Sequence, residues 1–186
     1  MNQMRVMLRP VQREDLEILF RQVNEPEGMR MVGSVRDSHT DRDAYMARWE
    51  TIFANAKVIP RAIILSGGDM SAGSVGGVGG EGSEVIAGSI ACFERVAEPS
   101  RPCRILPGPE IGYWLGRAFW GKGIASEAVR LFVAEVPTRP LYARAASDNV
   151  GSIRVLQKAG FKEIGREMFF ANMRGQEIEE TLMVVG

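Results

Sequence analysis

The segment with the clearest chemical signature combines a strand, a glycine-containing turn and a helix. Glu110–Gly116 has the pattern of a strand, and Phe119–Ala128 then passes through two glycines into an amphipathic helix. The first turn of a helix has backbone N–H groups without intrahelical partners, beside the positive end of the helix dipole. This geometry binds phosphate, and Gly121 and Gly123 have no Cβ to keep a pyrophosphate from the backbone. Lys122 adds a positive charge unless its side chain faces the solvent. The alternative is a tight turn whose glycines serve packing alone.

The two most common phosphate-binding motifs do not occur at this turn. The Walker pattern Gly-x-x-x-x-Gly-Lys-Ser/Thr is absent. The dinucleotide fingerprint Gly-x-Gly-x-x-Gly fails because Gly121-x-Gly123 has no matching third glycine. A plain α/β module that binds some other phosphate ligand therefore stays as an alternative.

A second segment, Asp148–Phe161, is the other informative part of the chain. Together the two segments resemble the GNAT acetyltransferases, and most closely the branch of RimJ/RimL-type ribosomal-protein N-terminal acetyltransferases. The family's cofactor signature, Gln/Arg-x-x-Gly-x-Gly/Ala, falls on Trp120–Ala125. Gly123 and Ala125 match it, whereas the aromatic Trp120 departs from the first position in a way familiar in this branch. The family's second block matches at Asn149, Ser152, Lys158, Gly160 and Phe161. The resemblance runs from about Leu8 to Val185.

This resemblance implies a site for acetyl-CoA as a co-substrate. In the family, strands four and five splay apart and the pantetheine arm lies in the gap, where the backbone of Tyr113, Trp114 and Leu115 would pair with it. The diphosphate would lie on the turn formed by Trp120, Gly121, Lys122, Gly123, Ile124 and Ala125. Asn149 would hydrogen-bond the arm, a role that is compatible with its capping the next helix. Lys158 and Arg154 would reach the adenosine 3′-phosphate, or else form a solvated helix face.

The reaction that the resemblance implies needs a neutral amine and a route for protons. Deprotonating a lysine-like amine at pH 7 costs about 4–5 kcal/mol, but an α-amine costs only about 1 kcal/mol. Glu110, which begins the strand beside the acetyl site, is the expected general base, with an exposed strand-end carboxylate as the alternative. Ser152 would meet the departing thiolate, or is simply a serine in the first turn of a helix. Many family members use a tyrosine slightly later in this helix, and this chain has none there.

Composition excludes several other classes of function. Lys plus Arg number 23 and Asp plus Glu number 23, so the net charge is zero and no nucleic-acid partner is expected. No apolar run reaches the length of a membrane span, and the first nine residues contain no apolar core of a secretory signal. The two cysteines, Cys92 and Cys103, do not form a disulfide framework, so reduced thiols in the cytoplasm are expected, with Cys92 as a small buried hydrophobe. No cluster of ligands predicts a metal site, and the single histidine, His39, is interpreted as a surface residue.

Apolar spacing along the chain predicts a single domain over residues 1–186. The order of elements is β-α-α-β-β-β-α-β-α-β-β, which indicates an α/β fold with helices on the sheet faces. The expected strands are Arg5–Arg9, Arg61–Leu65, Glu84–Phe93, Glu110–Leu115, Leu141–Ala145, Lys162–Ala171 and Gln176–Val185. The expected helices are Leu16–Val23, one from about Thr40 with Thr40 as its cap, Gly123–Val136 and Ser152–Lys158. Ser66–Ser83 is rich in glycine and serine, which predicts a flexible loop. With the resemblance, this is the GNAT fold, a mixed central sheet of six to seven strands with a splay between strands four and five.

The sequence thus favours an N-acetyltransferase that moves an acetyl group from acetyl-CoA to a primary amine by direct attack in a ternary complex. The acceptor is either a protein N-terminal amine or a small-molecule amine, and the helices within Gln12–Asn24 and Thr40–Ala54 are expected to line its side. The alternative from another class is a CoA-binding regulatory domain without turnover, because a cofactor motif encodes binding rather than chemistry. The enzyme is expected to be a cytoplasmic monomer or homodimer.

Overall fold

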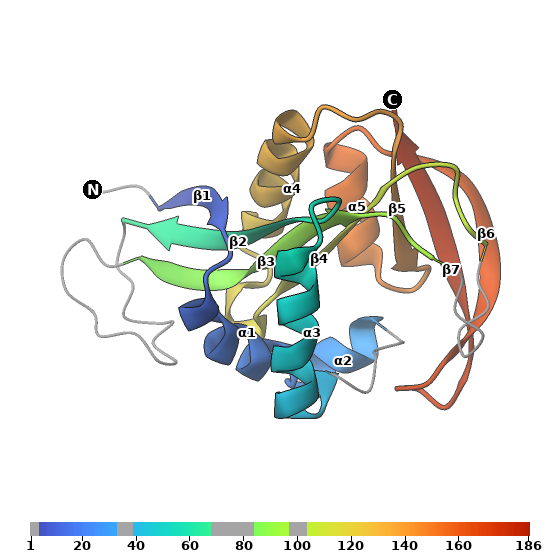
Figure 1. Ribbon diagram of the computed structural model, residues 1–186. Coiled ribbons are helices and arrows are strands. Elements are labelled where there is room, and N and C mark those ends of the chain that lie inside the picture. The colour runs from blue at the N-terminus through green and yellow to red at the C-terminus, as the bar shows by residue number, and fades with distance from the viewer. Residues whose placement is uncertain (1–3, 33–38, 68–83, 97–103) are drawn as a thin grey trace.

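The computed structural model describes residues 4–32, 39–67, 84–96 and 104–186, whose strands form one sheet (Figure 1). The strands are β1 (Arg5–Pro10), β2 (Ile59–Ser66), β3 (Val85–Phe93), β4 (Glu110–Leu115), β5 (Leu141–Ala146), β6 (Lys162–Ala171) and β7 (Gln176–Val185). The helices are α1 (Leu16–Val23), α2 (Pro26–Val32), α3 (Arg42–Ala54), α4 (Ile124–Glu135) and α5 (Val150–Lys158). None of the helices in these ranges is both long and apolar enough to cross a membrane. Cys103 and most of the predicted flexible loop, Ser66–Ser83, lie outside the described residues.

The sheet has the order β1-β2-β3-β4-β5-β7-β6. β4 and β5 run parallel, and every other neighbouring pair is antiparallel. This confirms the expected mixed sheet of six to seven strands. β6 and β7 keep the predicted bounds, because their turn begins and ends at clear polar residues.

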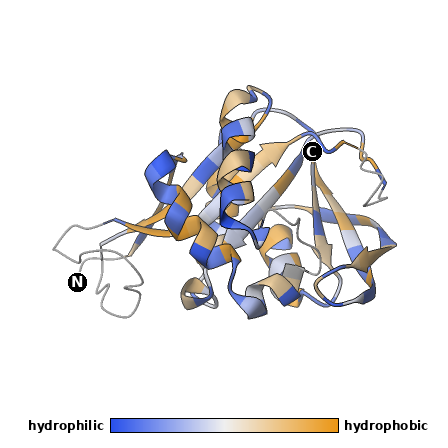
Figure 2. Ribbon diagram, turned by 60° about the horizontal axis from the view of Figure 1, so that its bottom comes forward, coloured by the Kyte–Doolittle hydropathy of each residue, from blue (hydrophilic) through white to orange (hydrophobic). Residues whose placement is uncertain are grey.

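Strand β2 shows why helices cover both faces of the sheet. Ile63 and Leu65 pack in the apolar cluster that contains α4 and α5, whereas Ala62 and Ile64 pack in the cluster that contains α1 and α3. All four side chains are buried. Successive strand residues point to opposite faces, so a continuous apolar run is what a strand covered on both sides requires. In Figure 2, hydrophobic residues accordingly dominate the central strands, whereas the helices carry both kinds of residue.

The two parallel strands in the middle of the sheet pair over a very short length. β4 and β5 are in register only at Glu110 with Tyr142 and at Ile111 with Ala143. β4 continues to Leu115 along its other neighbour, β3, and β5 continues to Ala146 along β7. The strands therefore part after two residues, which is the splay expected between strands four and five.

The predicted element order lacks one helix, α2. Asn24 and Pro26 predict the end of α1, and α1 does end there, with Asn24 as its C-cap. Pro26 also begins the next helix, because proline is favoured at a first helical position, where its missing N–H costs nothing. A carboxylate oxygen of Glu25 accepts a hydrogen bond from the N–H of Gly28 at 2.9 Å and so satisfies one of the first-turn donors of α2.

The cap of α3 differs from the prediction by one residue. Asp41, rather than Thr40, is the N-cap, and its Oδ1 accepts a hydrogen bond from the N–H of Ala44 at 2.8 Å. The two residues are adjacent and both belong to types that cap well, so the local pattern does not separate them. On the inner face of α3, Tyr45 and Trp49 are buried and pack in the same cluster as α1.

We expect the fold to depend strongly on Phe132 of α4, whose side chain is 0% exposed in the larger apolar cluster. Phe132→Ala should lower the free energy of unfolding by about 3–5 kcal/mol, because it removes buried apolar area and leaves a cavity. Urea unfolding measures this change, with an unchanged denaturant slope showing that the same surface is exposed. The half-buried neighbour Leu131→Ala is the control and should cost less. Equal losses for the two variants would contradict the packing described here.

Candidate functional site

A cavity of about 640 Å³ lies where β4 and β5 part. Its walls come from the free length of β4, the end of β5, the turn before α4, and helices α5 and α2. Of the residues expected to form the site, it is lined by Glu110, Tyr113, Trp114, Leu115, Trp120, Gly121, Gly123, Ile124, Ala125, Asn149, Ser152 and Lys158. The fold therefore brings together two segments that are remote in the sequence.

The turn before α4 adopts the backbone shape that its glycines permit. Gly121 and Gly123 have φ angles of 73° and 77°, in the left-handed region that other residues rarely adopt. Gly123 is the N-cap of α4, so the N–H groups of the first helical turn point out of the helix end beside it. A Cβ added at either glycine would meet nothing within 4 Å. The turn is thus an open cradle of N–H groups of the kind that receives phosphate.

Trp120 has a structural task that explains the aromatic residue at the first signature position. Its indole Nε1 donates a hydrogen bond to the carbonyl of Leu115 at 2.7 Å, and its ring packs against the larger apolar cluster. This bond ties the end of β4 to the turn before α4. This bond occupies the Leu115 carbonyl, and the Trp114 carbonyl lies against Gly88 of β3. Of the three residues expected to pair with the arm, Tyr113 therefore keeps the backbone groups with room for a ligand along β4.

Asn149 caps α5, which is one of the two roles expected for it. Its Oδ1 accepts a hydrogen bond from the N–H of Ser152 at 3.0 Å, and its Nδ2 donates to the carbonyl of Met31 at 3.3 Å. The first bond fixes the start of α5 and with it Ser152. The second joins α5 to the end of α2. The role of Asn149 toward the pantetheine arm stays a prediction.

A phenol that the sequence analysis considered only for its backbone lies against Ser152. The Tyr113 hydroxyl is 2.6 Å from Ser152 Oγ and also donates to the Ser152 carbonyl at 3.2 Å. Burial raises the pKa of Tyr113 to about 12, although the hydrogen bond with Ser152 acts in the opposite direction. The phenol is therefore neutral at physiological pH and keeps its proton. The alternation of Tyr113 with Ile111 and Leu115 in the strand was a usable signal, because it places all three side chains on the face that carries α5.

Glu110 is buried, so the alternative of an exposed strand-end carboxylate is wrong, while its role as the general base stays a prediction. Its side chain is 1% exposed and is held by two guanidinium groups. Oε2 accepts hydrogen bonds from Nε of Arg95 at 2.9 Å and from Nε of Arg144 at 3.0 Å, and Oε1 accepts from Nη2 of Arg144 at 3.1 Å. Two positive charges compensate the burial of the carboxylate, which would otherwise be prohibitive.

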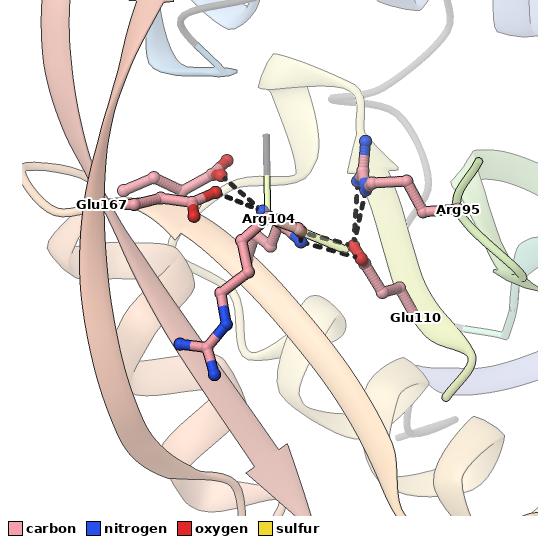
Figure 3. A network of polar contacts seen from close by, with 6 residues as sticks. Arg95, Arg104, Glu110 and Glu167 are labelled. Atoms are coloured by element: carbon pink, nitrogen blue, oxygen red, sulfur yellow. Dashed lines mark hydrogen bonds and ion pairs between the residues drawn. The ribbon is translucent and has the colours of Figure 1, made fainter. Parts of the chain in front are cut away.

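Arg144 extends this ionic network toward β6 and β7. Its Nη1 donates to Glu167 and lies 3.5 Å from a carboxylate oxygen of Glu180, while its Nη2 also donates to the Arg104 carbonyl. In Figure 3, Glu167 lies at the left of the network and Arg95 and Glu110 lie together at the right, with Arg104 between them. A charged residue inside the otherwise apolar strand Leu141–Ala146 was the sequence signal for this network.

Other residues singled out in the sequence lie elsewhere. The exposed Lys122 is not among the residues that line this cavity, although its backbone belongs to the turn. His39 is half-buried, with its ring edge toward Tyr45, and also lies outside the cavity lining. Cys92 is buried as expected, and burial raises the pKa of its thiol. In the ranges that the structure describes, no three His, Cys, Asp or Glu side chains are grouped in a way that could hold a metal ion.

Comparison with known proteins places the chain in a family. The model of the Acetyltransferase (GNAT) domain family matches residues 5–162, which is most of the chain. The chain therefore belongs to the GNAT acetyltransferase family, and the resemblance stated from the two sequence segments is confirmed.

Individual relatives match over shorter lengths. The probable N-acetyltransferase YjcK of Bacillus subtilis is 48% identical over 59 residues, which are 30% of this chain and 33% of that protein. The uncharacterized N-acetyltransferase p20 of Bacillus licheniformis is 34% identical over 74 residues, which are 38% of this chain and 42% of that protein. These matches thus span a third to two fifths of the length of the curated relatives.

Solved structures share the fold across almost the whole chain. Spermidine N-acetyltransferase from Vibrio cholerae, in complex with CoA and spermine, superimposes with a TM-score of 0.70 at 16% identity, covering 97% of this chain and 94% of that one. RimJ of Mycobacterium smegmatis, in complex with CoA-disulfide, gives 0.67 at 17% identity, covering 97% and 81%. At these identities the likeness establishes the fold.

We expect Tyr113 to stay protonated where an ordinary tyrosine is half ionised, near pH 10. Its folded-state pKa lies above the unfolded value, so the neutral phenol stabilises the fold fully below about pH 10. This contribution is then lost as the pH rises toward 12. Ultraviolet titration of phenolate in the wild type and in Tyr113→Phe measures it, since the chain has only three tyrosines. The variant should lack one of the groups that ionise near pH 12. Loss of a group that ionises near pH 10 would contradict the burial of this phenol.

Proposed function

We propose that this chain is an N-acetyltransferase that transfers an acetyl group from acetyl-CoA to a primary amine. The observation that carries the proposal is the continuity of one cavity from the glycine turn at α4 to the hydroxyl pair of Tyr113 and Ser152. Membership of the GNAT acetyltransferase family supports the reaction class. Structures of the same fold contain CoA or acetyl-CoA, which supports the co-substrate.

The cavity fits a ligand with a phosphate at one end and an extended arm. The N–H groups around Gly123 suit the diphosphate, and the open space above Gly121 and Gly123 leaves room for it. Beyond Ile111, β4 has no strand partner on the cavity side, so its backbone can pair with the arm as another strand would. Exposed side chains of Arg154 and Lys158 at the cavity wall suit the 3′-phosphate. Acetyl-CoA would supply an acetyl group activated as a thioester.

Glu110 is the proposed acceptor of the amine proton, directly or through a water molecule. The carboxylate lines the cavity, and a general base must lie within hydrogen-bond reach of the proton that it takes. Among the described residues, Oε1 accepts a single hydrogen bond, so this oxygen is the one with room for another donor. For an α-amine acceptor the demand on this base is small, because deprotonation costs only about 1 kcal/mol at pH 7.

Tyr113 and Ser152 are the proposed donors for the departing sulfur. The two hydroxyl groups share a hydrogen bond, and Tyr113 is protonated because burial raises its pKa to about 12. Ser152 can donate to the thiolate while its oxygen accepts the proton of Tyr113. This pair favours an enzyme over a regulatory domain that only binds CoA, since binding alone does not require two half-buried hydroxyl groups in contact at the splay.

Both acceptor classes remain within the proposal. The spermidine N-acetyltransferase with the same fold was crystallised with spermine, and RimJ also has this fold. The screen that tests the function therefore offers acetyl-CoA with polyamines, amino-acid esters and short peptides with free N-termini, and detects acetylated products by mass spectrometry. Failure to acetylate any amine, with acetyl-CoA still bound, would favour the regulatory alternative.

Acetyl-CoA binding should depend on the glycine turn. Gly123→Asp should abolish binding measured by calorimetry, because it forces a side chain into a left-handed position and adds negative charge where the diphosphate lies. NAD and ATP should bind far more weakly than acetyl-CoA to the wild type. The matched control is Gly175→Asp, which introduces the same strain at a φ of 63° in the turn between β6 and β7. Unchanged affinity in a folded Gly123→Asp protein would remove this turn from the site.

Substitutions at the residues proposed to transfer protons should lower kcat without weakening acetyl-CoA binding. Glu110→Gln should lower kcat by roughly 10²–10⁴, the usual share of one general base, with acetyl-CoA affinity nearly unchanged. The loss should shrink at high pH, where more of the amine is neutral. Ser152→Ala should lower kcat less, because a water molecule can replace the hydroxyl group, and Tyr113→Phe should resemble it.

The same variants test whether Glu110 serves only the ionic network. A purely structural carboxylate would change the free energy of unfolding in Glu110→Gln but leave the shape of the pH–rate profile as in the wild type. Such a profile, equal also in height, would exclude Glu110 as the base.

A further inference from the structure

Helix α2 forms part of the wall of the cavity without being part of the sheet. Gly28 and Met31 of this helix line the cavity. The helix has only seven residues, which is too short to be stable by itself. Its position must therefore come from contacts at its two ends.

The first end of α2 is held by Trp114 of β4. The indole Nε1 of Trp114 donates a hydrogen bond to the carbonyl of Gln22 at 3.1 Å, in the last turn of α1, which leads into α2. The ring lies so close to Gly28 that an added Cβ would be 2.8 Å from Cζ2 of Trp114. This end is therefore fixed by the same strand that borders the cavity.

The second end of α2 is held by Arg174, from the turn between β6 and β7. The carbonyls of the last helical turn have no intrahelical donors. Nε of Arg174 donates to the carbonyl of Arg30 at 2.7 Å, and Nη2 lies 3.5 Å from the carbonyl of Met31. The cationic side chain is 15% exposed and also suits the negative end of the helix dipole.

Asp148 fixes the orientation of this guanidinium. It forms a two-pronged ion pair with Arg174, in which Nη2 donates to Oδ1 at 3.1 Å and Nη1 donates to Oδ2. The hydrogen bond with Arg174 holds the pKa of Asp148 below its usual value, so both partners are charged at neutral pH. The next residue, Asn149, donates to the Met31 carbonyl and caps α5. The end of α2 and the start of α5 are thus joined by adjacent residues.

We propose that Arg174 is a positioning residue that clamps α2 over the cavity as the wall on the acceptor side. This proposal rests on the proposed function. The clamp keeps α2 in the place where an amine approaches the acetyl group, and Asp148 keeps the guanidinium oriented toward the carbonyls of Arg30 and Met31. Arg174 touches no reacting atom, so its loss should weaken acceptor binding rather than the chemical step.

The test compares Arg174→Ala with Arg166→Ala. Arg166 lies in the same β-hairpin and forms ion pairs with Glu163 and Glu179, but none of its described contacts reaches α2. Hydrogen exchange of the amides in residues 26–32, read by mass spectrometry with acetyl-CoA present, should become about tenfold faster in Arg174→Ala and stay unchanged in Arg166→Ala. With spermidine or an alanine-initiated peptide, whichever the wild type acetylates faster, the acceptor KM should rise about tenfold, which corresponds to about 1.4 kcal/mol. Both kcat and the acetyl-CoA Kd should change by less than about threefold, which is less than the tenfold rise expected for the acceptor KM.

Two further variants keep the result interpretable. Arg174→Lys should recover only part of the effect, because one ammonium group cannot span both carbonyls and the carboxylate as a planar guanidinium does. Asp148→Asn keeps Arg174 but removes its charged partner, and should show the same direction of change if Arg174→Ala does not fold.

The outcomes separate this proposal from the proposed function. Unchanged exchange in residues 26–32 overturns the clamp. Faster exchange with an unchanged acceptor KM overturns the positioning role, and a fall in kcat at constant KM does the same. If the wild type acetylates no amine, the proposed function fails, while faster exchange in Arg174→Ala but not in Arg166→Ala still supports the clamp.

Discussion

β4 and β5, two parallel strands at the centre of this sheet, pair at only two positions. Every other feature of the site follows from this short pairing. Backbone groups along the rest of β4 lose a strand partner in the interior, where unpaired donors and acceptors are costly. The end of β4 is therefore secured by the Trp120 indole at the Leu115 carbonyl, while the middle of the strand opens on the cavity. In the proposed function, the gap between the two strands is the place that receives the extended arm of acetyl-CoA.

The same parting brings charge into the interior. Glu110 begins β4 at the point where pairing ends, and its burial is tolerated because Arg95 and Arg144 each donate to it. Removing one member of such a network leaves an uncompensated buried charge, which typically costs about 3–5 kcal/mol. The network also links the parted strands to β6 and β7 through Glu167 and Glu180. The ion pair of Glu110 with Arg144 thus joins β4 to β5 beside the place where their backbone pairing ends.

Local patterns in the sequence predicted the elements well and the side-chain partners poorly. The glycine turn, the cap at Asn149 and the bounds of β6 and β7 depend on neighbouring residues, so they can be read from short segments. Helix α2 was missed because Pro26 both follows one helix and begins another. The contact of Tyr113 with Ser152 joins residues 39 positions apart, and the ion pairs of Glu110 join strands whose register no local pattern encodes. Residue types showed what the site is able to bind, but only the fold showed which groups touch.

The hydroxyl pair has a consequence for how such sites diverge. Tyr113 extends from β4 to a point beside the first turn of α5, so a phenol in that place can be encoded on a strand as well as on the helix that it approaches. Selection that preserves the position of an atom does not have to preserve the position of the residue that carries it. A sequence alignment compares residues at equivalent positions. A functional group that one protein carries on a helix and another carries on a strand therefore appears as a loss at the helix position, and its replacement at the strand position is not noticed. Similarity between this chain and proteins of the same fold at 16–17% identity is therefore best sought by superimposing functional atoms rather than by counting identical residues.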